Sequence, residues 1–150
     1  MEISIQNTIF VVYINDIFRI MILNDIFKDD RKLIEASREG ITKKDYSKIV
    51  KSTGLTLELF ALMTHITART LQRKKPEEKL SPEASERAIL IGKLYFTGQE
   101  VFGKKEKFQS WMNRENISLN QKKPKELLDT ITGIGLVQDE LLRIEYGFVA

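Results

Sequence analysis

The stretch GLTLELFALMTHITARTLQRKK, residues 54–75, indicates two short helices joined by a tight turn. Thr56 and Thr67 each stand where a helix N-cap is expected, since a threonine hydroxyl can accept a hydrogen bond from the first helical turn. Three apolar residues share one face of the first helix and are predicted to be buried: Leu59, Leu62 and Met63. The spacing therefore predicts a helix-turn-helix.

The second helix of this motif is almost entirely polar. Leu71 is its only strong apolar residue, so its other side chains point away from a core. A helix that enters the major groove of DNA needs donors for base edges near its start and cations for phosphates along its flanks. The predicted DNA-binding residues are Thr67, Arg69, Thr70, Gln72, Arg73 and Lys74.

A basic helix face can also be no more than a solvated surface. The turn is atypical as well, because His65 stands where many such motifs place glycine. The charge distribution favours DNA binding over a solvated surface. Residues 40–75 contain eight Lys or Arg against two Asp or Glu, a net charge of +6, whereas residues 82–150 contain ten of each. The basic block therefore contains the second helix of the motif, which is the helix predicted to contact DNA bases.

The composition excludes several kinds of chemistry. The chain has no cysteine, so disulfides, thiolate catalysis and cysteine zinc sites are impossible, and a cytoplasmic location is expected. His65 is the only histidine, so one chain cannot assemble a His-based metal site or a Ser-His arrangement. No pair of Asp or Glu residues has a spacing that suggests general acid–base catalysis. We predict no catalytic residue, no metal, no cofactor and no enzymatic activity.

Residues 1–28 allow more than one reading. Ile9 to Ile14 are β-branched or aromatic and favour a strand, whereas Ile17, Phe18, Met21, Ile22 and Phe27 favour a helix. Asp16, Arg19 and Asp25 interrupt the apolar run, which is then shorter than the roughly 20 residues that span a bilayer. Glu2 argues against a signal peptide. We expect packing against the domain or self-association, with Met21 as an alternative start.

Helices are predicted on both sides of the basic block. Asp30 can cap a helix that ends at Glu39, with Leu33 and Ile34 inward and Gly40 as a left-handed stop. Thr42 can cap a second helix that ends at Gly54. Its inward residues are Tyr46, Ile49 and Val50.

Ser81 and Pro82 open the longest predicted helix, which ends at Gly103. Two adjacent apolar stripes run along it, so it should contact neighbours on more than one side. The stripes are Ala84, Ala88, Ile91, Tyr95 and Phe102, and Leu90, Leu94 and Val101. At about 1.5 Å per residue it spans about 30 Å and can join the basic half to the rest.

Shorter helices are predicted after Gly103. Phe108, Trp111 and Met112 share one face and are expected in the core, and Ile117 and Leu119 anchor a polar loop over 116–123. Pro124 starts a helix with Leu127, Leu128 and Ile131 inward. Gly133 and Gly135 are interpreted as a helix-breaking turn and not as a nucleotide loop. A packing seam follows at Ile134, Val137, Leu141, Ile144 and Phe148.

From about residue 33 to the last residue, the chain resembles the Xre/MbcA/ParS-type antitoxins, the partners of RES-domain toxins in type II toxin–antitoxin systems. The order and spacing of many short pieces carry the resemblance. These are Leu33-Ile34-Glu35, Gly40-Ile41, residues 66–73, Leu80-Ser81-Pro82, Glu100-Val101-Phe102-Gly103, Phe108, Trp111, Pro124, residues 127–130, Gly133-Ile134-Gly135 and residues 142–147.

The resemblance implies an all-α protein, with an Xre-like helix-turn-helix N-terminal half joined by a long helix to a helical toxin-binding C-terminal half. The expected divisions are an N-terminal extension over 1–28, a DNA-binding domain over 29–80 and a toxin-binding domain over 81–150. It implies an antitoxin that occludes a RES-domain, NAD-consuming toxin and with it represses its own operon. The expected partners are that toxin, operator DNA, and a homodimer or a higher hetero-oligomer with the toxin; no membrane is expected.

The toxin-binding surface is predicted at the end of the chain. The residues are Val137, Glu140, Arg143, Ile144, Tyr146, Gly147, Phe148, Val149 and Ala150. A helix that breaks at Gly147 leaves a short apolar tail with a carboxylate, which could plug the toxin's cleft; alternatively, Phe148 folds back as core. The rival functions are a stand-alone transcription regulator with a dimerisation or sensing domain, and a scaffold without a DNA role.

Overall fold

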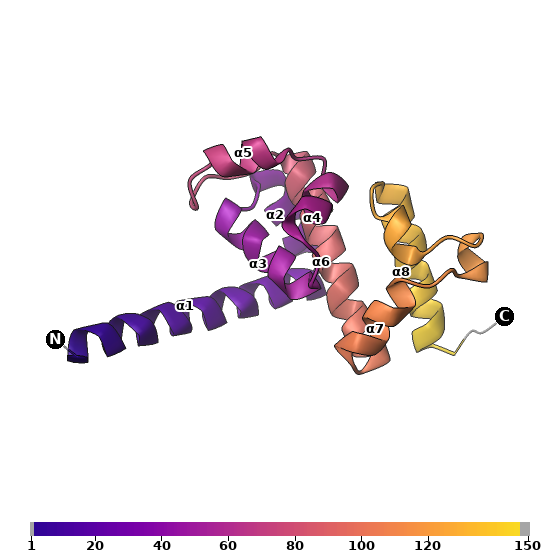
Figure 1. The fold of residues 1–150 in the computed structure, drawn as a ribbon, viewed down its shortest axis with the longest axis horizontal. Coiled ribbons are helices and arrows are strands. Elements are labelled where there is room, and N and C mark those ends of the chain that lie inside the picture. The colour runs from indigo at the N-terminus through magenta and orange to yellow at the C-terminus, as the bar shows by residue number, and fades with distance from the viewer. Residues whose placement is uncertain (1, 148–150) are drawn as a thin grey trace.

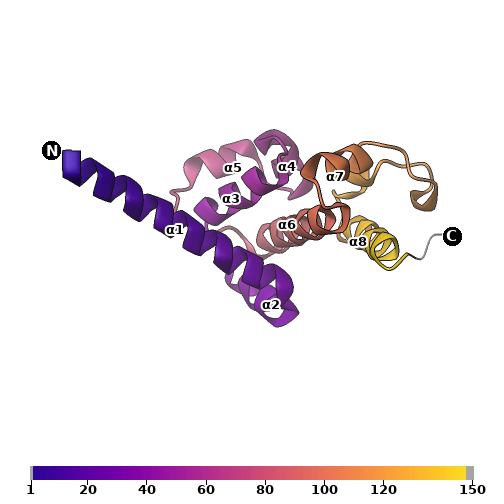
Figure 2. The same ribbon diagram turned by 90° about the horizontal axis from the view of Figure 1, so that it is seen from below.

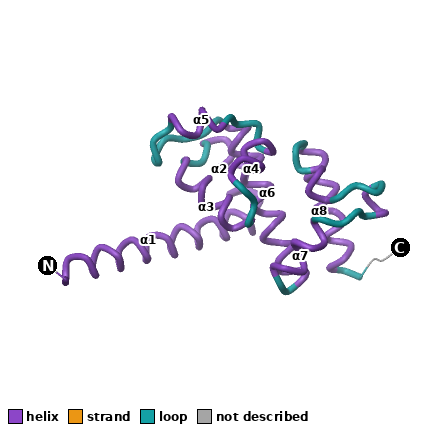
Figure 3. Tube along the Cα trace, in the orientation of Figure 1, coloured by secondary structure: helices purple, strands orange, loops and turns teal. Residues whose placement is uncertain are grey.

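The computed structural model describes the backbone of residues 2–147, and all of their side chains except those of 2–5, 7, 12–13 and 15–20. The α-helices are α1 (Glu2–Lys28), α2 (Asp30–Glu39), α3 (Lys43–Thr53), α4 (Leu57–Met63), α5 (Ala68–Arg73), α6 (Pro82–Phe102), α7 (Lys105–Met112) and α8 (Ile131–Glu145), and two 3₁₀ helices, η1 (Ile117–Leu119) and η2 (Pro124–Leu127), precede α8. Over residues 2–147 the chain contains helices and loops but no strand (Figure 3). The predicted all-α class is confirmed.

Helix α6 is the axis on which the fold is built. It packs against α1, α2 and α3 on the N-terminal side and against α7 and α8 on the C-terminal side (Figures 1 and 2). Ala88, Ile89, Ile91 and Leu94 are fully buried. A helix that is apolar around most of its circumference needs neighbours on several sides. The predicted bounds and joining role of this helix are therefore confirmed.

Side-chain caps start most of the helices. Thr42, Thr56, Thr67, Ser81 and Thr130 each accept a hydrogen bond from the first turn of α3, α4, α5, α6 and α8. Left-handed Gly54 and Gly103 end α3 and α6. The predicted cap of α2 is wrong by one residue, because the carboxylate of Asp29 and not that of Asp30 accepts the amide of Arg31, at 2.9 Å.

Helix α1 replaces the strand considered for residues 9–14, so that reading is wrong. Its C-terminal end is built into the core, where Leu23 and Phe27 are buried. Phe27 packs on Phe96 of α6 with ring centroids 6.0 Å apart. It passes over Gly92, where an added Cβ would lie 2.8 Å from the Phe27 ring. The N-terminal part extends away from the other helices in two perpendicular views (Figures 1 and 2).

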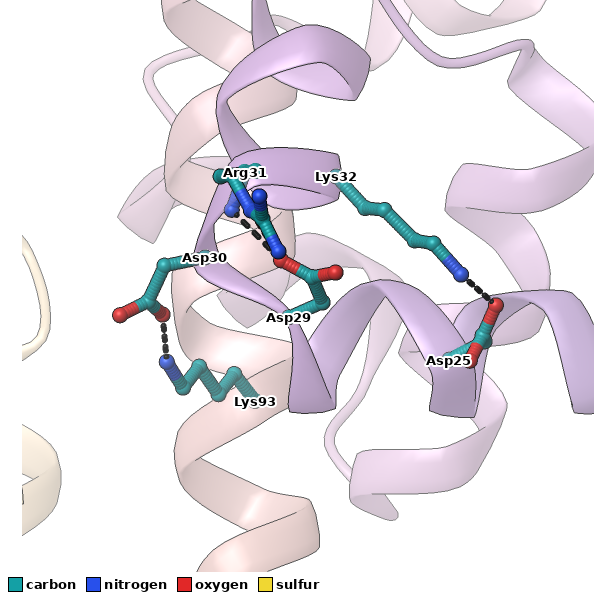
Figure 4. Close-up of polar contacts among 6 residues, drawn as sticks. All are labelled: Asp25, Asp29, Asp30, Arg31, Lys32 and Lys93. Carbon is teal, nitrogen blue, oxygen red and sulfur yellow. Dashed lines mark hydrogen bonds and ion pairs between the residues drawn. The ribbon is translucent and has the colours of Figure 1, made fainter.

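Ion pairs fix the junction of α1, α2 and α6 (Figure 4). The ammonium group of Lys93 on α6 lies 2.6 Å from the carboxylate of Asp30, and Lys32 pairs with Asp25 across the α1–α2 corner. Lys93 lowers the pKa of Asp30, first by a hydrogen bond and then by its charge. Asp25 raises the pKa of Lys32 mainly through a hydrogen bond. Because the carboxylates of both pairs are largely exposed, each pair contributes little to stability; Lys32–Asp25 joins α1 to α2, and Asp30–Lys93 joins α2 to α6.

Several predicted core residues are exposed instead. Ile34, Leu62, Ile117 and Ile131 are between 41% and 83% exposed. Phe60 and Ile89, which were not predicted to be inward, are fully buried. Phe60 takes the inward position in α4 that Leu62 was expected to share, and its ring meets the edge of Tyr46 at 5.2 Å.

The glycines at 133 and 135 do not break a helix, so the predicted turn is wrong. Both lie in the first turns of α8, which begins after Thr130. An added Cβ at Gly133 would lie 1.9 Å from the carbonyl oxygen of Leu127, whereas one at Gly135 would meet nothing within 4 Å. Gly133 therefore allows α8 to start directly beneath the residues that follow Pro124. Pro124 itself opens the 3₁₀ helix η2 and not an α-helix.

Candidate functional site

The turn between α4 and α5 is held by local backbone contacts. His65 adopts a positive φ of 57°, the conformation that glycine usually supplies at this point. The amide of Ile66 donates to the carbonyl of Ala61 at 3.0 Å, and the Thr67 hydroxyl accepts the amide of Thr70 at 3.1 Å. These contacts confirm the predicted helix-turn-helix and set the direction of α5.

Helix α5 presents the predicted DNA-binding side chains to solvent. Leu71 is 3% exposed and anchors the helix, while the surrounding residues face outward. Thr67, Arg69, Thr70, Gln72 and Arg73 are exposed, and Lys74 is half-buried. The helix lies at the edge of the molecule (Figure 1). Five of the six predicted residues therefore share one accessible surface, which leaves the arginines free to reach an acidic ligand.

A lysine-lined hollow of about 530 Å³ borders the end of α5. Lys43, Lys44, Lys48 and Lys51 of α3 line it together with Pro76. The Lys43 ammonium donates to the carbonyl of Lys74 at 2.8 Å, so the basic residues of α3 and of the segment after α5 form one patch. Lys44, Lys48 and Lys51 recur at spacings of four and three in the sequence, which places them on one face of a helix.

The turn also contacts the C-terminal half. The His65 ring Nε2 lies 2.9 Å from the carbonyl oxygen of Asp129, and Arg87 of α6 donates to the same oxygen at 3.0 Å. A carbonyl oxygen only accepts, so the His65 Nε2–H is the donor of this hydrogen bond. Residues that separate η2 from α8 are thus fixed to the turn between α4 and α5.

The predicted residues of α8 do not all reach the surface. Val137 is fully buried and Glu140 is 8% exposed, so both belong to the core that α8 shares with α6. Arg143, Tyr146 and Gly147 are exposed, and Ile144 is half-buried. The helix ends before Gly147, whose φ is 70°, as predicted. Phe148, Val149 and Ala150 lie outside the described residues.

Glu140 pairs with Arg143, one of the exposed residues of α8. Its Oε2 lies 3.5 Å from the Nε of Arg143 and has no hydrogen-bond partner. A buried carboxylate with one cation beside it holds that cation in place electrostatically. Glu140 is therefore better described as positioning Arg143 than as a contact residue.

Other groups that sequence reasoning did not assign to a site lie beside α7. The side chains of Phe102, Trp111 and Ile117 line a hollow of about 790 Å³. Phe108 is fully buried as predicted, whereas Trp111 is only half-buried and faces the hollow. The exposed position of Ile117 depends on the shape of the 113–123 loop, which spacing does not specify.

The described residues contain no group of three or more acidic or histidine side chains placed to hold a metal. The strongly shifted titratable groups among them are structural tyrosines. Burial raises the pKa of Tyr46 to about 12, although the hydrogen bond between the Tyr46 and Thr64 hydroxyls opposes the shift. Burial also raises the pKa of Tyr95 well above its usual value. In the part of the chain that the structure covers, no helix is long and apolar enough to cross a bilayer.

Two family models match the chain in sequence order. Residues 32–92 match the antitoxin Xre-like helix-turn-helix domain. Residues 97–147 match the antitoxin Xre/MbcA/ParS C-terminal toxin-binding domain. The first match contains α4 and α5, and the second contains α7, α8 and the hollow beside α7. A search of curated proteins gave no match.

Proposed function

We propose that this chain, which carries the helix-turn-helix and toxin-binding domains of the Xre/MbcA/ParS antitoxins, occludes a RES-domain, NAD-consuming toxin and with it represses its own operon. The observation that carries the proposal is the match of both domains on one α6-centred fold. The proposed site of action is the cytoplasm, where both operator DNA and NAD are found.

The toxin surface is proposed on the exposed end of α8. Arg143 and Tyr146 provide the strong contacts, because arginine and tyrosine dominate protein interfaces and Tyr146 is 68% exposed. Ile144 and Gly147 complete this surface, and Phe148, Val149 and Ala150, which lie outside the described residues, are included in the proposal on sequence grounds alone. Val137 and Glu140 are left out because a partner cannot reach them while α8 is packed on α6.

The DNA surface is proposed on α5. Arg69 and Arg73 supply charged donors, Thr67, Thr70 and Gln72 supply polar contacts, and Lys74 with the α3 lysines supplies phosphate contacts. The exposure of α5 supports this role, since a reading helix must be accessible along its whole length.

Self-association is proposed through α1. Its residues Phe10, Ile14 and Met21 are 62%, 47% and 62% exposed, although large apolar side chains are usually buried. In the sequence, Asn7, Phe10, Ile14, Ile17, Met21 and Asn24 recur at alternating spacings of three and four, the repeat of a coiled-coil seam. A second copy of the chain or of the antitoxin–toxin complex is the proposed partner.

Co-expression with any RES-domain protein encoded beside this chain's gene tests the proposal. The expected result is co-purification of the two proteins, restored growth and binding of the complex to DNA upstream of the operon. A chain that binds this DNA alone and neither captures nor neutralises its neighbour would instead be a stand-alone regulator. Absence of any RES-domain neighbour would also oppose the proposal.

A further inference from the structure

The hollow beside α7, called the groove below, has apolar and charged residues in its lining; the apolar residues are named its floor and the charged residues its rim. Its floor is formed by Phe102 at the end of α6, by Trp111 on α7 and by Ile117 at the start of η1. Ile117 is 83% exposed, the highest value among the exposed large hydrophobic side chains of the described residues. Such exposure of a branched apolar side chain beside a half-buried tryptophan is typical of a protein-binding patch.

The aromatic floor is rigid. The Trp111 ring stacks on fully buried Phe108 at a centroid distance of 6.1 Å and an angle of 23°, and contacts Phe102 at 5.6 Å. Phe108 lies directly on α6 because Gly98 lacks a Cβ, which would come within 2.1 Å of the ring. A partner that binds Trp111 therefore meets a surface whose side-chain entropy has already been lost.

The rim offers oriented charge. Arg114 is exposed, and its Nε and Nη2 donate to the Ser110 hydroxyl at 3.2 and 2.8 Å. This anchoring leaves guanidinium donors for a carboxylate, the group that arginine recognises best. Lys107 lies on the same rim, and Glu106 and Glu115 provide anions beside the two cations.

The groove lies in the same matched domain as the proposed toxin surface. All of its lining residues fall within 102–117, inside the matched toxin-binding domain. The 3₁₀ helix η1, which begins with Ile117, packs against α8. Both views place α7 and the 113–123 loop at the end of the molecule where α8 ends (Figures 1 and 2).

We infer that this groove is a second docking site for the toxin and takes a toxin segment that carries a large apolar side chain next to a carboxylate. The apolar side chain inserts between Trp111 and Ile117, and the carboxylate pairs with Arg114. This inference rests on the proposed function, because it assumes that the toxin is the partner of residues 97–147. The groove would add affinity and specificity to the contacts made by the end of α8.

The test uses the full chain and the proposed RES-domain toxin. Ile117→Glu places a charge on the apolar floor, and Arg114→Glu reverses the charge of the rim; both residues are exposed, so the fold should be retained, as circular dichroism can check. The matched control is Leu62→Glu, which alters a 70% exposed apolar residue outside the toxin-binding domain. Isothermal titration measures the affinity.

Each groove variant is expected to weaken toxin binding at least tenfold, whereas Leu62→Glu should change it less than twofold. Binding of both groove variants within twofold of the parent would overturn the inference. Tyr146→Ala separates this failure from failure of the proposed function. If Tyr146→Ala weakens binding and the groove variants do not, the toxin binds α8 alone; if the parent itself does not bind, the proposed function fails.

Discussion

Gly133 and Gly135 stand two residues apart in α8 but meet different surroundings. An added Cβ at Gly133 overlaps the backbone of Leu127, while the same atom at Gly135 points into open space. Gly133→Ala should therefore destabilise the chain by about 2–3 kcal/mol, as expected for forced overpacking against backbone. Gly135→Ala should stabilise it by about 0.5–1 kcal/mol, because alanine favours the helix.

Urea unfolding of the two glycine variants checks this prediction, and each serves as the control for the other. Equal effects at the two positions would contradict the close approach of α8 to residue 127.

The buried Tyr46 hydroxyl makes the stability of the helix-turn-helix depend on pH in the alkaline range. Its hydroxyl lies 2.8 Å from that of Thr64, and burial raises its pKa to about 12. Because its folded-state pKa is above the unfolded value of about 10, its contribution is complete below pH 10 and is lost as pH rises from about 10 to about 12. Tyr46→Phe should cost about 1 kcal/mol at neutral pH through the lost hydrogen bond.

Denaturant unfolding of the parent and Tyr46→Phe at pH 7, 10 and 11.5 measures both effects. The variant should lose less stability than the parent between pH 10 and 11.5, with the remaining loss due partly to Tyr95, whose pKa is also raised. Parallel curves would show that Tyr46 does not carry the pH dependence.

Residue-level predictions succeeded where the signal was local. The caps at Thr42, Thr56, Thr67 and Ser81 were predictable because each hydrogen bond joins residues three apart. The inward face of α4 was not, because a helix of seven residues with Leu, Phe and Met on several sides has no unique apolar stripe. Phe60 takes the inward position because its ring packs on that of Tyr46. This contact joins two different helices, so the spacing within α4 does not reveal it.

The exposed arginines of α5 lead to a prediction about how operator binding depends on salt. If Arg69 and Arg73 contact DNA, Arg69→Ala or Arg73→Ala in the antitoxin–toxin complex should weaken operator binding by about 1–3 kcal/mol where a base contact is lost. Where a phosphate contact is lost, the slope of log K against log salt should fall by about 0.9. Fluorescence anisotropy at several salt concentrations measures both quantities.

Arg31→Ala is the matched control, since Arg31 lies on α2 and its side chain is 91% exposed. Equal affinity for the parent, the α5 variants and the control would remove α5 from the DNA surface.

At the scale of helices and turns, the contact between the N-terminal and C-terminal halves could not be predicted from the sequence. The sequence marked His65 as unusual in a turn, and its positive φ confirms the expected backbone. Its partner, the Asp129 carbonyl, lies 64 residues away and could not be found from spacing. The buried positions of Val137 and Glu140 were hidden for the same reason, since an apolar seam does not reveal which of its residues a second helix covers.

For the whole molecule, α1 predicts a concentration-dependent dimer. The exposed seam residues Phe10, Ile14 and Met21 should pair with a second copy, and Phe10→Glu with Met21→Glu should abolish pairing because each copy would place charges on the seam. Light scattering after size exclusion should give a mass above 17.4 kDa that rises with concentration for the parent, and 17.4 kDa for the double variant.

Leu62→Glu, which lies outside α1, should leave the association unchanged. A parent that stays at 17.4 kDa at every concentration would contradict self-association through this helix.

The architecture of the whole chain was largely predictable, because α6 has strong caps and two apolar stripes. The division of the chain into 1–28, 29–80 and 81–150 stays a prediction; the two family matches meet within α6, between residues 92 and 97, so this helix serves both halves. The extension of α1 from the other helices was unpredictable, since a continuous apolar run does not reveal whether a partner is present.

Growth rescue tests most directly whether one chain keeps its DNA and toxin surfaces apart on the two sides of α6. Cells expressing the proposed RES-domain toxin would also receive the parent, the Arg69→Ala/Arg73→Ala variant or the Arg143→Ala/Tyr146→Ala variant, all at matched levels from an unrelated promoter. The parent and the α5 variant should restore growth, and the α8 variant should not. Failure of the parent to restore growth, or equal loss of protection in both variants, would contradict separate toxin-binding and DNA-binding surfaces.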